Sequence, residues 1–494
     1  IKRLSLTWQT ISRRYFCDIK TRLKALEFLS IYVKHNDAIL LDVQRISLWL
    51  HYCSSLKELR IMAPRQISNT LSNNDIGLHS FDFPQLHTLV LSTPGTSLVG
   101  SFLGMLYYKL MIAVMNLKNW QHIWITGFGN ALITPVLSGL SEAKTLMLRI
   151  PHRVYLRETL SNVEHFAVEL SLQERDPPNL ELLELPSLKK LFLCTCLPME
   201  WDVLCNLCCN VEELNIATCI TNINQIHFQD KLVKLALCTC ILRGKPYEPS
   251  SKAEQINKVI RIIVESFPNI REFELTTCKV CFGKPNDIVL DSLLGVFGKW
   301  KDLRRLKFED LECIRSGNSL AHIFTTCSNL ESISLKNLGL HGSCTYLCEL
   351  CIGLRSCKNL KDFRLEQANI LAVDCIITAL KNCTKLERIC IISSNHTVPP
   401  TNKNFKDMIR KLNKLVFLYL DLPTTKVQRK DFKKILKAEF GSSCPEFYST
   451  IVNYGTKNCD SVNRLPAIHY FEMLEDVSRI SRRPGNGRKF LYTS

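Results

Sequence analysis

The fold of this chain is set by the stretch Thr326-Cys327-Ser328-Asn329-Leu330-Glu331-Ser332-Ile333-Ser334-Leu335, which contains the spacing apolar, two residues, apolar, one residue, apolar. The same spacing returns in Leu360-Phe363-Leu365 and in Leu386-Ile389-Ile391. Alternation of this kind over so short a run indicates a β-strand with one buried face. Because the spacing returns with a similar interval, it indicates an internal repeat rather than an isolated strand.

The repeat extends along most of the chain. Clear copies begin at Leu56, Leu86, Leu188, Val211, Leu232, Leu303, Leu330, Leu360, Leu386 and Leu415. Weaker copies begin at Ile1, Leu23, Trp120, Ala143, Val163 and Ile270. Successive copies start 20 to 38 residues apart. One short strand and one return segment fit such an interval.

The segments before the strands carry a helical pattern. Apolar residues at i, i+3, i+4 and i+7 close just before a strand anchor, as in Leu320-Ile323-Phe324-Cys327. Similar stripes begin at Ile46, Trp201, Ile260, Leu293, Leu350, Ile376 and Phe405. We therefore predict an α/β fold: a leucine-rich-repeat solenoid of about sixteen repeats, with a curved parallel β-sheet on its concave face and helices on its convex face.

Three phrases carry a resemblance to a known family. They are Thr326-Cys327-Ser328-Asn329-Leu330, Ser356-Cys357-Lys358-Asn359-Leu360 and Asn382-Cys383-Thr384-Lys385-Leu386. They resemble the Cys-x-x-Leu lead into the strand in the cysteine-containing, ribonuclease-inhibitor-like repeats of F-box proteins, the substrate-recognition subunits of SCF ubiquitin ligases. The resemblance covers roughly residues 1 to 422, and it lies in the repeat type, which other ribonuclease-inhibitor-like arrays share.

The resemblance implies a protein target and, through an F-box, a Skp-type adaptor and a cullin as partners. We find no F-box in these residues. The chain opens Ile1-Lys2-Arg3-Leu4 already within the repeat pattern. We therefore expect that sequence precedes residue 1 and that an F-box, if the family role holds, lies there.

The composition bounds the class of partner and the compartment. Lys and Arg number 63 against 46 Asp and Glu, a formal charge of +17. This excess favours acidic or phosphorylated proteins, nucleic acid or anionic membrane, and selects none of them. The chain has 23 cysteines, which in a long chain without a signal peptide indicates a reducing, cytoplasmic or nuclear location. We expect a monomer outside its complex.

Motifs for catalysis, cofactors or metals do not stand out. The pairs Cys205/Cys208, Cys278/Cys281 and Cys348/Cys351 have zinc-like spacing. We interpret them as core thiols, because buried free cysteine behaves as a small hydrophobe.

Neither a P-loop nor a paired His motif is found, so we predict no enzyme, no cofactor and no metal site. The apolar window 98–117 contains Lys109, and we predict a buried helix there rather than a membrane span.

Two regions depart from the repeat. The longest interval contains the polar run 243–252, which we expect to be an exposed loop that either contacts a partner or is simply solvated. After about residue 422 the pattern fades. We therefore divide the chain into a solenoid over 1–422 and a C-terminal cap with a basic tail over 423–494; we expect the tail to be solvated, and nucleic-acid binding there is the less favoured alternative.

Binding residues are expected on the concave sheet, at the second, fourth and sixth positions after each first anchor, because side chains alternate along a strand. Aromatic residues and Arg dominate interface energetics. The candidates in the middle repeats are His122, Trp124, Arg149, His165 and Phe192. Those in the later repeats are Arg305, Lys307, Arg364, Arg388, Phe417 and Tyr419.

The pattern and the resemblance together predict a protein-recognition solenoid that serves as the substrate-binding part of an SCF-type ubiquitin ligase. A repeat scaffold or inhibitor outside ubiquitination is the alternative, and the module that accompanies the repeats would distinguish the two.

Overall fold

The structure is a computed structural model. It describes residues 2–8, 23–33, 46–62, 81–92, 106, 109–112, 121–126, 142–150, 160–170, 184–194, 199–218, 220–238, 253–276, 294–311, 318–338, 344–368, 373–393, 400–421, 426–440 and 446–448.

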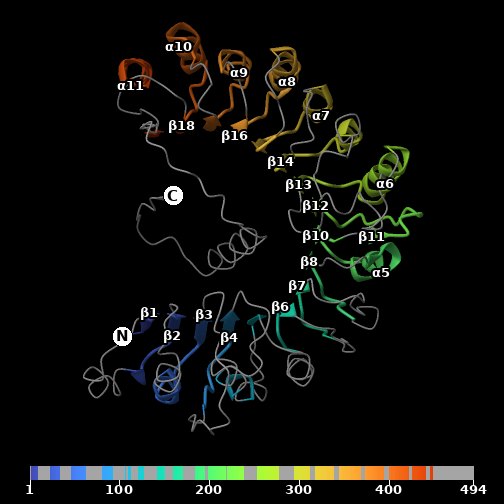
Figure 1. Cartoon of the computed structure of the whole chain (residues 1–494), viewed down its shortest axis with the longest axis vertical. Coiled ribbons are helices and arrows are strands. Elements are labelled where there is room, and N and C mark those ends of the chain that lie inside the picture. Colours follow the sequence, from blue (N-terminus) through green and yellow to red (C-terminus); the bar gives the residue numbers. More distant parts are fainter. Residues whose placement is uncertain are drawn as a thin grey trace.

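A single parallel sheet of 17 strands forms the inner wall of a horseshoe (Figure 1). Each strand pairs with that of the next repeat, so the sheet follows chain order. The strands are β1 (Arg3–Trp8), β2 (Phe28–Val33), β3 (Glu58–Met62), β4 (Thr88–Ser92), β5 (His122–Thr126), β6 (Thr145–Ile150), β7 (His165–Leu170), β8 (Lys190–Cys194), β10 (Glu213–Ala217), β12 (Lys234–Cys238), β13 (Glu272–Thr276), β14 (Arg305–Glu309), β15 (Ser332–Lys336), β16 (Asp362–Ala368), β17 (Arg388–Ser393), β18 (Phe417–Asp421) and β19 (Glu446–Tyr448). A separate small sheet pairs β9 (Met199–Glu200) with β11 (Ile220–Thr221).

The return segments carry helices on the outer wall of the curve (Figure 1). They are α5 (Trp201–Leu207), α6 (Ala253–Ser266), the 3-10 helix η4 (Leu294–Lys299), α7 (Asn318–Thr326), α8 (Cys344–Ser356), α9 (Asp374–Leu380), α10 (Asn402–Lys411) and α11 (Lys426–Phe440). Each buries its apolar stripe toward the sheet, as Leu320, Ile323 and Phe324 do on α7. The predicted α/β solenoid, with a concave parallel sheet and convex helices, is confirmed.

Two details of the repeat differ from the expected spacing. The copy placed at Leu23 begins three residues later, because Leu26, Leu29 and Ile31 are the buried anchors of β2 while Phe28 is only half-buried. Both phases satisfy the spacing, and only burial distinguishes them. Strand β19 continues the sheet beyond residue 422 by pairing with β18, where the recurring pattern has faded.

The Cys of the Cys-x-x-Leu phrase lies in the core and joins neighbouring repeats. The thiol of Cys327 donates to the carbonyl of Trp300 at 3.4 Å, and the thiol of Cys383 donates to that of Leu354 at 3.4 Å. Burial raises the pKa of Cys327 to about 11 and that of Cys383 to about 12. These thiols therefore stay protonated, and each serves as a buried donor to a backbone carbonyl of the preceding repeat.

The Asn before the anchor adds a second link between repeats. The side-chain amide of Asn359 donates to the carbonyl of Ser328 at 3.1 Å, and that of Asn269 donates to the carbonyl of Asp230 at 2.8 Å. Each accepting carbonyl lies in the turn of the repeat before. The phrase Cys-x-Asn-Leu thus combines a core thiol, a turn-bridging amide and a strand anchor.

Gly353 marks a close approach of α8 to α7. An added Cβ would lie 2.6 Å from Cα of Ala321 and 3.0 Å from its carbonyl oxygen. Ala in place of Gly usually stabilises a helix by about 1 kcal/mol. Here the two helices would have to separate, so we expect Gly353→Ala to lower the free energy of unfolding by about 1–3 kcal/mol, measured by urea denaturation.

Gly295→Ala is the matched control, since its Cβ would meet the ring of His322 at an ordinary 3.4 Å. A Gly353→Ala protein as stable as the wild type would contradict the close approach.

Candidate functional site

The concave face is organised as rows of side chains that cross the strands. The register aligns the fourth residue after each first anchor, and we call this line the central row. From β3 to β18 it comprises Arg60, Val90, Trp124, Met147, Ala167, Phe192, Asn215, Ala236, Glu274, Lys307, Ser334, Arg364, Cys390 and Tyr419. The row is apolar from Val90 to Phe192 and carries the charged residues Glu274, Lys307 and Arg364 in the second half of the horseshoe.

The apolar half of the central row forms a small hydrophobic cluster of its own. It consists of Val90, Trp124, Met147, Ala167 and Phe192, with Cys194 packed against it. Trp124 is only 5% exposed and Phe192 only 4% exposed. These two predicted binding residues therefore lie on the concave side, but they are buried rather than presented to solvent.

Histidines border this cluster one row toward the start of the strands. His122 and His165 occupy the second position on β5 and β7. The hydroxyl of Thr145 lies 3.4 Å from Nδ1 of His165. Burial lowers the pKa of His122 and lowers that of His165 to about 4. Both rings are therefore neutral at physiological pH and fit the apolar surface beside them.

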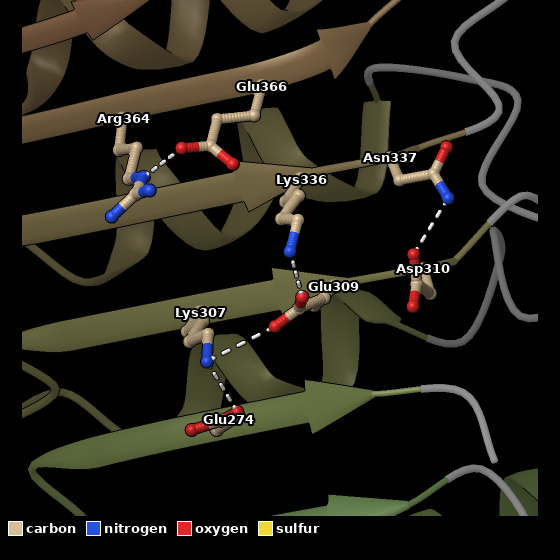
Figure 2. Close-up of polar contacts among 8 residues, drawn as sticks. All are labelled: Glu274, Lys307, Glu309, Asp310, Lys336, Asn337, Arg364 and Glu366. Carbon is tan, nitrogen blue, oxygen red and sulfur yellow. Dashed lines mark hydrogen bonds and ion pairs between the residues drawn. The ribbon is translucent and has the colours of Figure 1, made fainter. Parts of the chain in front are cut away.

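The charged half begins with a chain of ion pairs that neutralise one another (Figure 2). The ammonium group of Lys307 lies 2.9 Å from a carboxylate oxygen of Glu274 and 3.2 Å from one of Glu309. Glu309 also pairs with Lys336 at 2.5 Å. Burial by itself would raise the pKa of Glu309, but the hydrogen bond from Lys336 and the charge of Lys307 hold it below its usual value.

The arginines of this half keep more of their surface in solvent. Arg305 pairs with Glu272 at 3.1 Å yet is 67% exposed. Arg364 pairs through Nε with Glu366, which is itself only 8% exposed (Figure 2). Arg388 is exposed at the start of β17. The surface offered to a partner is therefore cationic, with carboxylates underneath.

The remaining predicted residues lie on β18 and β6. Phe417 and Tyr419 are half-buried on β18. Arg149 belongs to β6, and its side chain lies outside the described residues, as do the polar run 243–252 and the basic tail. The register brings Arg305, Lys307, Arg364 and Arg388 onto neighbouring strands.

Two further concave residues stand among these arginines without having been singled out from the sequence. Ser332 and Asp362 occupy the second position on β15 and β16, between Arg305 and Arg388. The spacing rule places both on the concave face. The strand register, and not the spacing rule, shows that both residues lie next to the arginines.

Other chemistry finds little support among the described residues. No group of His, Cys, Asp and Glu in the described ranges could hold a metal ion. Cys205 and Cys208 are both buried on or beside α5, and Cys351 is buried on α8 while Cys348 is exposed; Cys278 and Cys281 are not among the described residues. Across the described ranges, no helix is long and apolar enough to span a bilayer.

The comparisons with known proteins agree with this architecture. Residues 267–447 match the family model described as "F-box/LRR-repeat protein 18, LRR". These residues are similar to the repeats of F-box/LRR-repeat proteins. The F-box/LRR match contains β13 to β18, and with them the arginines of the charged half.

A relative and a solved structure show the extent of the likeness. The chain is 30% identical over 197 residues to human F-box/LRR-repeat protein 18, which covers 40% of this chain and 27% of that protein. The chain thus matches about a quarter of that relative's length. It also resembles the crystal structure of the leucine-rich repeat-containing protein LegL7 from Legionella pneumophila, with 12% identity, a TM-score of 0.28, and coverage of 89% of this chain and 98% of that one.

The buried histidines are expected to make the protein less stable as the pH falls. The unfolded chain takes up a proton at His165 near pH 6.5, whereas burial lowers its folded pKa to about 4. Between these values the unfolded state binds more protons, so the free energy of unfolding falls as pH falls from about 6.5 to about 4. We expect His165→Gln to make this fall shallower in denaturation series across that window.

The control is His322→Gln, which replaces an exposed ring on α7. It is expected to keep the slope of the wild type. If both variants gave the wild-type slope, burial of neutral His165 would be refuted.

Proposed function

We propose that this solenoid is the target-binding part of an SCF-type E3 ubiquitin ligase and holds its protein target on the concave face. The observation that carries the proposal is the match of residues 267–447 to F-box/LRR repeats. The exposed arginines on the inner surface of the same residues support it, because Arg is among the side chains that dominate binding energy at interfaces.

In this role the solenoid performs no chemistry of its own. It would hold a target close to a ubiquitin-loaded partner and raise the effective concentration of the target's lysines. A rigid repeat array suits this task, because each repeat is fixed by its neighbours and the inner surface is already formed before the target binds.

Affinity capture of the full-length protein from cell extract tests the proposal, with and without proteasome inhibition. We expect a Skp-type adaptor and a cullin to be recovered in both conditions. Inhibition should increase the recovery of target proteins, because targets that are no longer degraded accumulate on the concave face.

An unrelated leucine-rich-repeat protein, captured in parallel, controls for nonspecific binding to repeats. Capture of stable partners without adaptor and cullin would refute the ligase role and favour a repeat scaffold or inhibitor outside ubiquitination.

A further inference from the structure

The second half of the concave face presents three arginines above carboxylates. Arg305 and Arg364 are 67% and 56% exposed, whereas their partners Glu272 and Glu366 are 34% and 8% exposed. Arg388 is exposed as well. Within the part of the chain that the structure describes, Arg388 has no ion-pair partner.

The strand register gathers these three side chains. Arg305 on β14 aligns with Ser332 on β15, which aligns with Asp362 on β16, which aligns with Arg388 on β17. Arg364 stands two residues after Asp362 on the same face of β16. Neighbouring strands lie about 4.8 Å apart, so the long arginine side chains can converge over the strand or two between them.

Asp362 lies within the electrostatic reach of all three arginines. Burial raises the pKa of Asp362, and the charges of Arg388, Arg364 and Arg305 each act against that rise. All three guanidinium groups are therefore close enough to act on one carboxyl group. Ser332, a small residue with a hydroxyl donor, lies between this carboxyl and Arg305.

Guanidinium N–H groups remain available at each arginine. Glu366 engages Nε of Arg364, and Glu272 engages one terminal nitrogen of Arg305. A guanidinium group has five N–H donors in a rigid plane, which match the oxygens of a phosphate in pairs. The buried Glu366 also fixes the orientation of Arg364 before any ligand arrives.

We propose that Arg305, Arg364 and Arg388, with the hydroxyl of Ser332, bind a phosphorylated serine or threonine on an extended segment of the target protein. The inference rests on the proposed function in that it takes the concave face as the target-binding surface. It adds that the target is recognised in a phosphorylated state.

The surroundings of the three arginines favour one phosphate over a nucleic-acid backbone. On β14 and β15 themselves, Lys307 and Lys336 are already held by Glu274 and Glu309. Beyond β17, β18 contributes the aromatic residues Phe417 and Tyr419. A polyanion needs a continuous basic track. Among the described concave residues of the charged half, the strongly exposed positive charges are those of Arg305, Arg364 and Arg388.

Substitution of Asp362 is expected to change phosphate binding in the opposite direction to substitution of an arginine. An anion bound by the three guanidinium groups lies near this carboxylate and is repelled by it whenever the carboxylate is ionised. Asp362→Asn removes the repulsion and keeps a side chain of similar shape. We expect it to tighten phosphate binding, whereas loss of an arginine weakens it.

Retention of short peptides on the purified, immobilised protein measures this directly. Three pools share randomised flanks and carry phosphoserine, serine or glutamate at the centre. We expect the phosphoserine pool to be retained at least about tenfold more strongly than the serine pool, since hydrogen bonds to charged groups are the stronger kind. Arg364→Gln and Arg388→Gln should remove most of that preference, and Asp362→Asn should increase it about threefold or more.

Arg261→Gln on α6 and Arg355→Gln on α8 are the matched controls, because they make the same charge change at exposed positions on the outer helices. They should retain the wild-type preference. The inference is overturned if the serine or glutamate pool binds as well as the phosphoserine pool, if single-stranded RNA displaces the phosphopeptides at equal phosphate concentration, or if the outer variants lose as much as the concave ones.

Capture of adaptor and cullin by the Arg364→Gln/Arg388→Gln protein separates this inference from the proposed function. If adaptor and cullin are recovered but the wild-type protein shows no preference for phosphorylated peptides, only the phosphate-binding inference is overturned. A phosphate preference without adaptor and cullin would leave the binding site standing and refute the ligase role.

Discussion

The parallel pairing of each strand with the strand of the next repeat is the interaction on which the rest of the structure depends. At the start of each strand, one carbonyl of the preceding repeat accepts two backbone N–H groups. The carbonyl of Arg304, for example, accepts from Glu331 at 2.7 Å and from Ser332 at 2.9 Å. Repeated along the array, this arrangement keeps successive strands in one register. A slip of one residue would exchange the buried anchors with the concave residues.

Because the register is kept, the chemistry of the inner surface follows directly from which residue stands at each concave position. The central row is apolar where Trp124, Met147 and Phe192 align, and charged where Glu274 and Lys307 align. Each repeat contacts mainly its neighbours, so the two halves keep separate chemistry within one continuous sheet. The apolar residues pack together and are buried, whereas Arg305, Arg364 and Arg388 of the charged half are exposed.

The strand anchors and the outer helices could be predicted from the sequence because each depends on a local period that burial imposes. The position of Leu23 could not, since Leu26 supports the same spacing in a second phase and only packing decides between them. Trp124 and Phe192 were predicted on the correct face, but they are buried in a cluster with apolar side chains of the neighbouring strands, which are distant in sequence. The electrostatic surroundings of Asp362 could not be predicted either, because they depend on Arg305 on β14 and Arg388 on β17. Both arginines are far from Asp362 in sequence, and the strand register brings them near it.

The contrast between lysine and arginine explains why only part of the charged half can recognise an anion. The compact ammonium group of Lys307 lies within 2.9 Å and 3.2 Å of two carboxylates, so its charge is largely satisfied inside the protein. The guanidinium group of Arg364 uses its Nε for Glu366 and still presents its terminal nitrogens to solvent. Burying Glu366 costs desolvation energy, and its pairing with Arg364 offsets that cost. That cost is understandable where an oriented cation is needed for binding, since an arginine held in place loses less freedom when it meets a phosphate than one free in solvent.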